Sequence, residues 1–280
     1  MNCLSTPVHQ YMVNGQPVFV KREDLCAPPG APPFSKMRGV LKHVQSRPES
    51  VIGVLDTFHS KAGWAVAYAC REFGKTCLNY YPEYKKLQGV VQPQQERAQE
   101  HGAGLVKLPA GRSAILFHRA KKDLAQFSSD SYMMPNALKL PESVDENAEE
   151  AERTGQQFHG HGLGTLVISI SSGTVASGVL VGLRRAGALP KDVILHMGYS
   201  RSHDEALHYI LGPLSRVWGP GPWTPPAVHL VDEGYNYADK VDFPAPFPCN
   251  PYYDLKAWKW LNTTAVRGLA RPILFWNIGD

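Results

Sequence analysis

The stretch TLVISISSGTVASGVLVGLRR, residues 165–185, decides the fold class. Its first part is a continuous run of apolar and β-branched residues, which is typical of a strand buried on both faces. Ser171, Ser172, Gly173 and Thr174 follow, and the next residues predict a helix. Such a strand-turn-helix brings backbone N–H groups and hydroxyls together at a helix N-terminus, where an anion binds well. A tight turn with a Ser or Thr N-cap is the structural alternative, and the turn alone does not decide between them.

Two familiar nucleotide motifs are absent from this turn. The sequence does not match GxxxxGK[ST], so a Walker-type nucleotide site is disfavoured. The glycine-rich GHGLG, residues 160–164, precedes its strand, whereas a dinucleotide fingerprint follows one. A phosphate cradle without a nucleotide signature suggests pyridoxal phosphate (PLP) as its ligand.

Strands and helices alternate along the rest of the chain. The predicted strands are short apolar runs, and the predicted helices are amphipathic segments of about 10–15 residues. The clearest strands are QPVFVKRED, SVIGVLDT, TCLNYY, GLVKLP, DVILHMGY and AVHLVDE, and the clearest helices are KAGWAVAYACREFGK, SAILFHRAKKDLAQF and DENAEEAERTGQQF. This alternation predicts an α/β protein with mostly parallel sheets.

Composition restricts the class of protein. The 280 residues suit one large domain or two interleaved ones, and 43% apolar with 19% charged residues is ordinary for a globular protein. No apolar run is long enough to cross a bilayer, and the first ten residues lack a signal-peptide pattern. Five scattered cysteines without a CxxC motif favour a reduced, cytoplasmic chain. His159 and His161 lack nearby acids or cysteines, so we expect no metal site.

Several motifs together resemble a known family. FSKMRG around Lys36, SSGTVASG and RPILFWNIGD occur in the order found in PLP-dependent enzymes of the tryptophan synthase β-subunit fold type (fold type II). VFVKREDL, DTFHSKAGWAVAYACREFGKTC and NPYYDLKAWKWL are similar to segments of the 1-aminocyclopropane-1-carboxylate deaminase and D-cysteine desulfhydrase group. The resemblance covers nearly the whole chain. Each motif is degenerate, and the ordered set is what makes the match specific.

The resemblance implies roles in binding the cofactor. Lys36 would form the Schiff base that an amino substrate displaces. Asp254 would sit at the pyridine nitrogen and keep it protonated, which makes the ring an electron sink. Tyr253 would act as an acid, a base or a nucleophile-like group. A helix-start cap with an aromatic staple is the structural alternative for Tyr253 and Asp254. The 5′-phosphate would be held by Ser172, Gly173, Thr174 and Val175.

The resemblance also implies a substrate site. Ser60 matches the loop that receives the substrate carboxylate and in some members passes a proton, so a catalytic role is expected for it. His59 stands where the family has glutamine. Lys61 replaces an asparagine; it could contact the cofactor, grip a carboxylate or phosphate, or point away, and it also competes with Lys36 as the Schiff-base lysine. Tyr235 in EGYNYAD could stack over the site, as could Tyr237, although packing alone explains both. Asn277-Ile278 replace His-Thr in the expected substrate shell.

The fold type implies two interleaved three-layer α/β/α domains in a homodimer. We expect residues 1–50 and 151–280 to form the large cofactor domain and 51–150 a small mobile domain. The main hypothesis for function is a lyase or deaminase that forms an external aldimine and a carbanion on a small amino acid.

Two alternatives remain open for the function. The first is a PLP enzyme that modifies an amino acid attached to a larger molecule, such as an aminoacylated base in viral DNA. The charge of +4 is compatible with nucleic acid but does not require it, because the basic residues are spread along the chain. The second is a non-catalytic descendant that uses the fold as a binding module.

Overall fold

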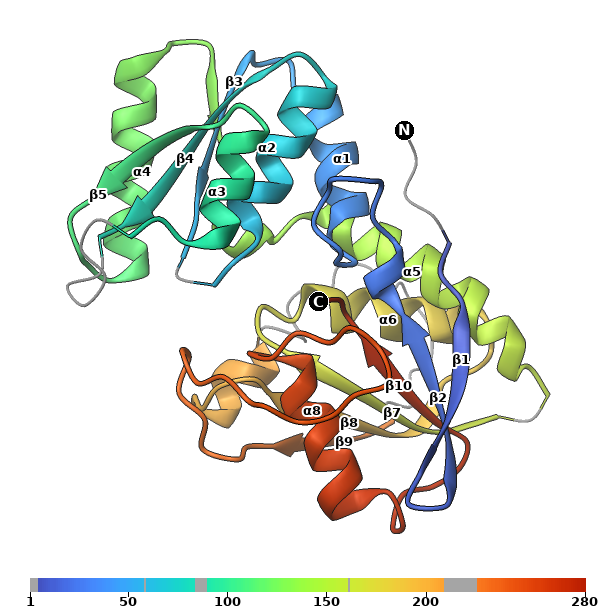
Figure 1. The fold of residues 1–280 in the computed structure, drawn as a ribbon. Coiled ribbons are helices and arrows are strands. Elements are labelled where there is room, and N and C mark those ends of the chain that lie inside the picture. Colours follow the sequence, from blue (N-terminus) through green and yellow to red (C-terminus); the bar gives the residue numbers. More distant parts are fainter. Residues whose placement is uncertain (1–4, 58, 84–89, 161, 209–225) are drawn as a thin grey trace. The chain divides into compact units, whose positions relative to one another are not determined.

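A computed structural model describes the chain except for residues 1–4, 58, 84–89, 161 and 209–225. The chain forms two compact units (Figure 1). The large unit comprises Met1–Pro28, Pro33–Arg38 and Ser143–Asp280, and the small unit comprises Pro29–Pro32 and Gly39–Glu142. Each unit contains a sheet with helices packed on it, which confirms the predicted α/β class with mostly parallel strands.

The large unit is built on a six-stranded sheet. Its first two strands pair antiparallel, and every other neighbouring pair of this sheet is parallel. Parallel pairing places the carboxyl ends of five strands at one edge, which we call the carboxyl edge. In spatial order the strands are β1 (Val8–Val13), β2 (Gln16–Arg22), β10 (Ile273–Asn277), β7 (Leu163–Ile170), β8 (Pro190–Met197) and β9 (Ala227–Val231).

Both faces of this sheet are covered, which explains the continuous apolar run of β7. Alternate residues of β7 and β10 belong to two different hydrophobic clusters, as a two-residue side-chain period requires. Leu166 and Leu274 lie in the cluster with α5 (Pro141–Gly155) and α6 (Thr174–Arg185). Val167 and Phe275 lie in the cluster with α8 (Asp254–Trp260), on the opposite face (Figure 1). The large unit therefore has three layers.

The small unit contains a parallel sheet with the strand order β5-β4-β3-β6. Leu116, Ala120 and Leu124 of α4 pack on one face of it. Helix α2 packs so closely on β4 that a Cβ at Gly63 would lie 2.2 Å from the side chain of Asn79. The elements are α1 (Met37–Ser46), β3 (Val51–Leu55), α2 (Ala62–Glu72), β4 (Thr76–Pro82), α3 (Pro93–Glu100), β5 (Gly104–Leu108), α4 (Ser113–Phe127) and β6 (Ser131–Met133).

The units differ from the expected domains in three short segments. Residues 29–32 belong to the small unit, where the Gly30 carbonyl accepts from the Trp64 indole N–H over 3.0 Å. Residues 39–50 belong to the small unit, because α1 contacts β6: a His43 ring nitrogen lies 3.2 Å from the Tyr132 hydroxyl. Residues 143–150 belong to the large unit, because Glu150 is bonded to the segment before β1 and to β2. These boundaries depend on contacts between residues far apart in the sequence, which local patterns do not reveal.

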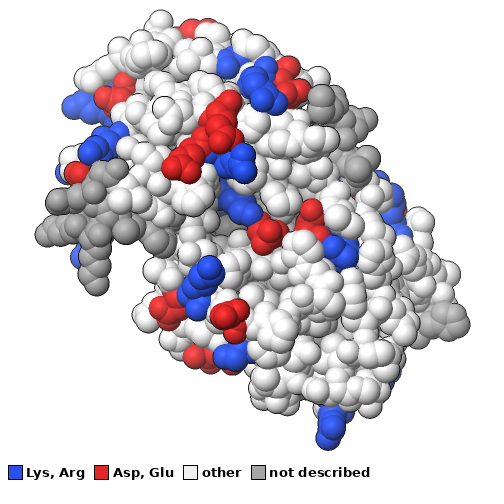
Figure 2. All heavy atoms as spheres, in the orientation of Figure 1, with Lys and Arg blue, Asp and Glu red and all other residues white. Residues whose placement is uncertain are grey.

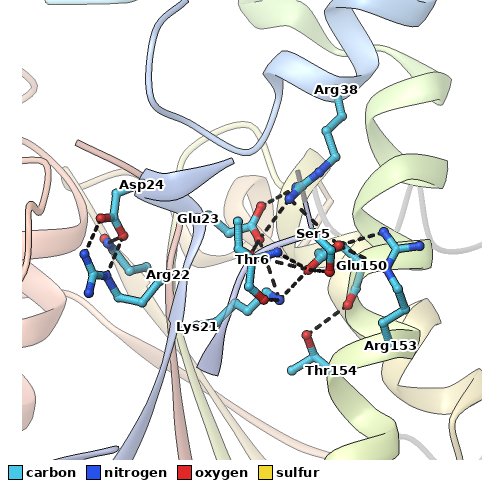
Figure 3. Close-up of polar contacts among 11 residues, drawn as sticks. Ser5, Thr6, Lys21, Arg22, Glu23, Asp24, Arg38, Glu150, Arg153 and Thr154 are labelled. Atoms are coloured by element: carbon cyan, nitrogen blue, oxygen red, sulfur yellow. Dashed lines mark hydrogen bonds and ion pairs between the residues drawn. The ribbon is translucent and has the colours of Figure 1, made fainter. Parts of the chain in front are cut away.

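A buried network of charges joins β2, α5 and the start of α1 (Figure 3). Lys21 and Glu23 point toward α5, where Lys21 donates to Glu150 and Arg38 donates to Glu23. These four side chains are at most 3% exposed. Two cations balance two anions, and the backbone N–H of Thr6 donates to Glu150 over 3.0 Å. Any shift of one element would leave a buried charge uncompensated.

The pKa of Glu150 reflects its position in this network. Burial by itself raises the pKa of the carboxyl, but the charge and hydrogen bond of Lys21, together with Arg153, outweigh burial and lower it to about 2. The unfolded chain has the ordinary value of 4.5. Ionised Glu150 therefore stabilises the fold above pH 4.5, and that stability is lost as the pH falls toward the folded pKa.

We predict that Glu150→Gln lowers the free energy of unfolding by about 3 kcal/mol at neutral pH. Urea unfolding at several pH values measures this. The loss arises because Lys21 and Arg38 keep their buried charges while one balancing anion is removed.

The matched control is Glu149→Gln, because Glu149 is the exposed neighbour on α5. The control should unfold like the wild type, and the Glu150 variant should lack most of the wild-type loss of stability between pH 4.5 and 2. Equal stability of the two variants would contradict the network's role.

Candidate active site

The carboxyl edge of the large sheet gathers most of the residues that the sequence singles out. Ser172 to Thr174 follow β7, Gly198 and Tyr199 follow β8, and the chain end 278–280 follows β10. Ligands of open α/β sheets bind at this edge, because loops and helix N-termini converge there. The large unit thus has its candidate site at the position that its topology favours.

Lys36 is held at this edge by the end of the chain. The Ser35 N–H donates to the Ile278 carbonyl over 2.9 Å, and the Asp280 N–H donates to the Pro33 carbonyl over 3.0 Å. A Cβ at Gly279 would lie 2.2 Å from the Pro33 carbonyl oxygen, so a side chain there would break this contact. The Lys36 ammonium then donates to the Ser172 hydroxyl over 2.9 Å. Two predicted site segments, 136 positions apart in the sequence, are therefore in direct contact.

The turn after β7 has the form of an anion cradle. Gly173 adopts a left-handed conformation, with a φ of 76°, as the N-cap of α6. The hydroxyls of Ser172 and Thr174 lie 3.1 Å apart, so they converge on one place. The Ser177 N–H and hydroxyl each donate to the Gly173 carbonyl over 2.9 Å and fix the turn, while Val175 is buried in the core. The N–H groups in the first turn of a helix have no intrahelical acceptor and favour an anion.

Asp254 opens helix α8 and is only 2% exposed. Its position is tied to the Lys36 segment through Asn250, whose N–H donates to the Gly279 carbonyl and whose carbonyl accepts from the Leu255 N–H. Burial raises the pKa of the Cys249 thiol, and the nearby carboxylates of Asp254, Asp280 and Asp24 raise it further. Asp254 is therefore a buried carboxylate, and Asp24 and Asp280 lie near the same thiol.

Tyr253 packs against the end of β8. A Cβ at Gly198 would lie 2.7 Å from the Tyr253 ring, so glycine is needed for this contact. Burial raises the pKa of Tyr253, and the charge of Tyr237 and a hydrogen bond with it raise the pKa further. The phenol therefore stays protonated at neutral pH and can donate a hydrogen bond.

The two tyrosines of EGYNYAD have different surroundings. Tyr235 belongs to the apolar cluster around α8, and the Lys256 ammonium lies 4.6 Å from its ring centroid. Lys259 donates to the Tyr235 hydroxyl over 3.4 Å. Tyr237 instead contacts Tyr199 and is hydrogen-bonded with Tyr253. The structure thus places Tyr237, rather than Tyr235, beside a predicted site residue.

Asn277 points into the protein. It is fully buried and donates to Asp24 over 2.9 Å and to the Pro248 carbonyl over 2.9 Å. Asp24 in turn forms a two-point ion pair with Arg22, at 2.8 and 2.6 Å. Asn277 therefore makes structural contacts that support β2, and its expected place in a substrate shell stays a prediction.

His59, Ser60 and Lys61 lie in the small unit, in the loop between β3 and α2. The Ser60 hydroxyl accepts from the Ala62 N–H over 3.1 Å, and Lys61 is the N-cap of α2. His59 is buried, and Phe58 lies outside the described residues. These three residues belong to the small unit, and their role in binding substrate stays a prediction.

The sequence analysis missed Asp56, which precedes this loop. Its side chain is fully buried and accepts from the Thr57 N–H over 3.0 Å and from Asn79 over 3.4 Å. Ser60 and the Gly63 N–H are also hydrogen-bonded to it. Burial raises the pKa of Asp56 to about 7, although these hydrogen bonds oppose the rise. An aspartate that ends a β-strand gives no sequence signal for such a pKa, because the shift depends on tertiary burial.

Within the described ranges no helix is long and apolar enough to cross a bilayer. The same part of the chain has no group of three or more His, Cys, Asp or Glu side chains that could hold a metal ion. His161, one half of the HxH pair, lies outside the described residues. Four cysteines are described, and all four are buried.

The fold and the carboxyl edge together define a PLP-dependent enzyme of fold type II. The structure matches an ACC deaminase homologue with a TM-score of 0.77 and 17% identity, over 99% of this chain and 89% of that one. An L-serine ammonia-lyase from Rhizomucor miehei gives 0.67 and 15%, over 99% and 93%. A threonine deaminase from T.th. gives 0.65 and 14%, over 99% and 92%. At these identities the likeness shows the fold alone.

A relative at higher identity shows the family. The glycyl-dTMP PLP-dependent decarboxylase of Pseudomonas phage M6 is 56% identical over 282 residues, which cover 99% of both chains. No family model matches the chain. The chain therefore belongs to the family of PLP-dependent enzymes that includes this phage decarboxylase.

The residues of the large unit fit the cofactor. An amine lies within hydrogen-bonding distance of a hydroxyl in the anion cradle, so one small molecule with an aldehyde and a phosphate can contact both. Asp254 is a buried carboxylate of the same unit that would suit a ring nitrogen.

We predict that the stability of the protein depends on the proton of Asp56. With an ordinary value of 3.8 and a folded pKa of about 7, the folded chain holds this proton more tightly than the unfolded chain. The stabilisation is complete below pH 3.8 and is lost as the pH rises through 7, by up to about 4 kcal/mol. Denaturant unfolding from pH 4 to 8 measures this decline.

Asp56→Asn keeps an acceptor for the Thr57 N–H and removes the titration, so this variant should lack the decline. Asp145→Asn, at an exposed position, is the control and should keep it. A decline of equal size in Asp56→Asn would assign the titration to another group.

Proposed function

We propose that this chain decarboxylates a glycyl group carried by a thymidine nucleotide, with PLP as cofactor. The observation that carries the proposal is the identity of 56%, over 99% of both chains, with the phage glycyl-dTMP decarboxylase. It favours the earlier alternative of an amino acid attached to a larger molecule over a deaminase for free amino acids. The contact between Lys36 and Ser172 argues against a non-catalytic descendant, because the amine and the anion cradle are both in place.

The chemistry restricts how the glycyl group is attached. The balanced reaction is R–CH(NH3+)–COO− plus H+ giving R–CH2–NH3+ plus CO2, in which the bond to the carboxylate breaks and a proton takes its place. PLP, when bound, supplies an aldehyde that takes up the amino group and a ring that accepts the electron pair. Both the amino group and the carboxylate must therefore be free, so we propose that the nucleotide is joined to the glycyl α-carbon.

The residues of the chain have separate tasks in this proposal. Ser172, Thr174 and the first turn of α6 hold the phosphate. Asp254 holds a proton on the ring nitrogen, because an adjacent negative charge raises the pKa of that nitrogen. Lys36 would hold the cofactor through its amine, and the same amine would donate the proton that replaces the carboxylate on the α-carbon. Tyr253, whose pKa is raised, supplies a second protonated donor on the same unit.

Two forms of substrate share this chemistry, the free nucleotide and the same nucleotide within DNA. Figure 2 shows Lys and Arg side chains interspersed with Asp and Glu on the face in view. The net charge of +4 is thus not gathered into one broad basic patch on that face. An assay with both substrates therefore has to separate the two forms.

We predict that Lys36 is the lysine that binds PLP. Borohydride reduction of the purified holoenzyme, followed by peptide mass spectrometry, should place the label on the peptide containing Lys36. Lys36→Ala should lose the label because it removes the amine that contacts the Ser172 turn, while Lys61→Ala should retain it. A label on Lys61, or on the buried Lys256, would reassign the site.

We predict that the holoenzyme releases CO2 from glycyl-dTMP and leaves the amino group on the product. The assay measures CO2 and product mass with glycyl-dTMP, with a short DNA containing it, and with free glycine and L-serine. Removing a positioned proton donor typically costs about 100-fold or more, so Lys36→Ala should lose at least that much activity.

Preference between the first two substrates identifies the natural form, and rising salt should weaken turnover of DNA more than that of the nucleotide. Release of ammonia from the free amino acids, with no CO2 from either nucleotide form, would overturn the proposal in favour of a deaminase.

A further inference from the structure

The carboxyl edge continues into an aromatic group beyond the catalytic residues. We propose that Tyr237, supported by Tyr199, stacks on the pyrimidine ring of the substrate and selects a nucleotide-linked amino acid. This inference rests on the proposed function, because it names the part of the site that recognises the thymine base. It adds a specificity-determining residue to the groups that bind the cofactor.

Tyr237 is held in place by two neighbours from different segments. Its ring meets that of Tyr199 nearly at right angles, with centroids 5.1 Å apart, and Tyr199 directly follows Gly198 at the end of β8. Its hydroxyl is hydrogen-bonded with Tyr253. Both Tyr237 and Tyr199 remain half-exposed, so the pair is ordered without being enclosed in the core.

The backbone around the pair is also fixed. The Ser200 N–H donates to the Tyr235 carbonyl over 2.8 Å, and the Ser200 hydroxyl donates to Asp232 over 2.5 Å. Asp239 accepts from the Asn236 N–H over 2.7 Å. The two Ser200 bonds join the loop after β8 to the loop after β9, and the bond to Asp239 closes a turn around Tyr237. A ring that is already ordered loses little conformational entropy when a base stacks on it.

The pair lies next to the residues that would hold the reacting atoms. Tyr253 contacts Tyr237 on one side, and Asp254 follows it directly in the chain. The buried carboxylate of Asp254 and the half-exposed rings of Tyr237 and Tyr199 are therefore only a few side chains apart. Since the decarboxylated carbon is joined to the nucleotide, the base must lie close to the cofactor. A flat neutral ring matches the π-face of a tyrosine, and such stacking contributes about 10- to 100-fold in affinity per base.

Tyr235, two residues earlier, provides a matched comparison. Its ring is packed in the α8 cluster, with the ammonium of Lys256 over it and its hydroxyl accepting from Lys259. A phenylalanine there keeps the packing and removes only the hydroxyl. The sequence suggested Tyr235 as the residue that stacks over the site, whereas the structure favours Tyr237. Comparing Tyr235→Phe with Tyr237→Leu distinguishes the two.

The test measures kcat and KM for glycyl-dTMP, and the inhibition constant of dTMP, with the holoenzyme. Tyr237→Leu should raise KM and the dTMP inhibition constant by about 10- to 100-fold, with kcat changed far less. Tyr237→Phe keeps the ring and should stay within a few-fold of the wild type, as should Tyr235→Phe. Reductive labelling of Lys36 reports whether each variant binds cofactor. Unchanged KM and inhibition constants in a labelled Tyr237→Leu variant would overturn the proposal.

A measurement on the wild type removes any dependence on variants that fold. Photo-crosslinking with 5-iodo-dUMP, followed by peptide mapping, should label Tyr237 or Tyr199, and labelling confined to other residues would contradict the stacking. Failure of the proposed function has a different signature, which is absence of CO2 from glycyl-dTMP. In that case dTMP binding by calorimetry still decides the present inference, because Tyr237→Leu must weaken it.

Discussion

The arrangement of the large unit depends on the buried charges of Lys21, Glu23, Arg38 and Glu150. Arg38 stands two residues after Lys36, so its bond to Glu23 ties the lysine segment to β2 and, through Glu150, to α5. Apolar side chains could fill this space with equal stability, but they would tolerate small displacements. Four balanced charges do not, since each needs its partner at hydrogen-bonding distance. The network therefore fixes the positions of β2, α5 and the Lys36 segment and also stabilises the fold.

Lys36 is fixed from both sides by these constraints. On one side Ser35 and Pro33 are bonded to the chain end that follows β10, and on the other side Arg38 is bonded to Glu23. With the backbone held in this way, the Lys36 amine lies within hydrogen-bonding distance of Ser172. Such preorganisation would serve the role proposed for Lys36, because little reordering of its segment would be left for the reaction.

Sequence patterns could predict the elements whose surroundings are uniform. Strand β7 is buried on both faces and reads as an unbroken apolar run, so the strand, its turn and α6 follow from residues 165–185. Strand β1 has exposed and half-buried residues, and β6 has three residues, so neither produced a signal. The same limit applies to the site. Tyr235 and Tyr237 look equivalent in the sequence, and only the packing around α8 separates them.

The fold explains why the reaction could not be read from the cofactor-binding residues. Matched structures of this fold include a threonine deaminase and an L-serine ammonia-lyase, and the relative at 56% identity is a decarboxylase. In the proposed site a lysine, an anion cradle and a buried carboxylate would all act on the cofactor, so this set of groups is compatible with each of these reactions. The choice of bond must depend on groups that orient the amino acid. Lys61 of the small unit stands where the resembled family has an asparagine. In the large unit, the half-exposed Tyr237, for which we propose base stacking, lies beside Tyr253. Specificity can therefore change through side chains around a shared cradle, without a change of fold.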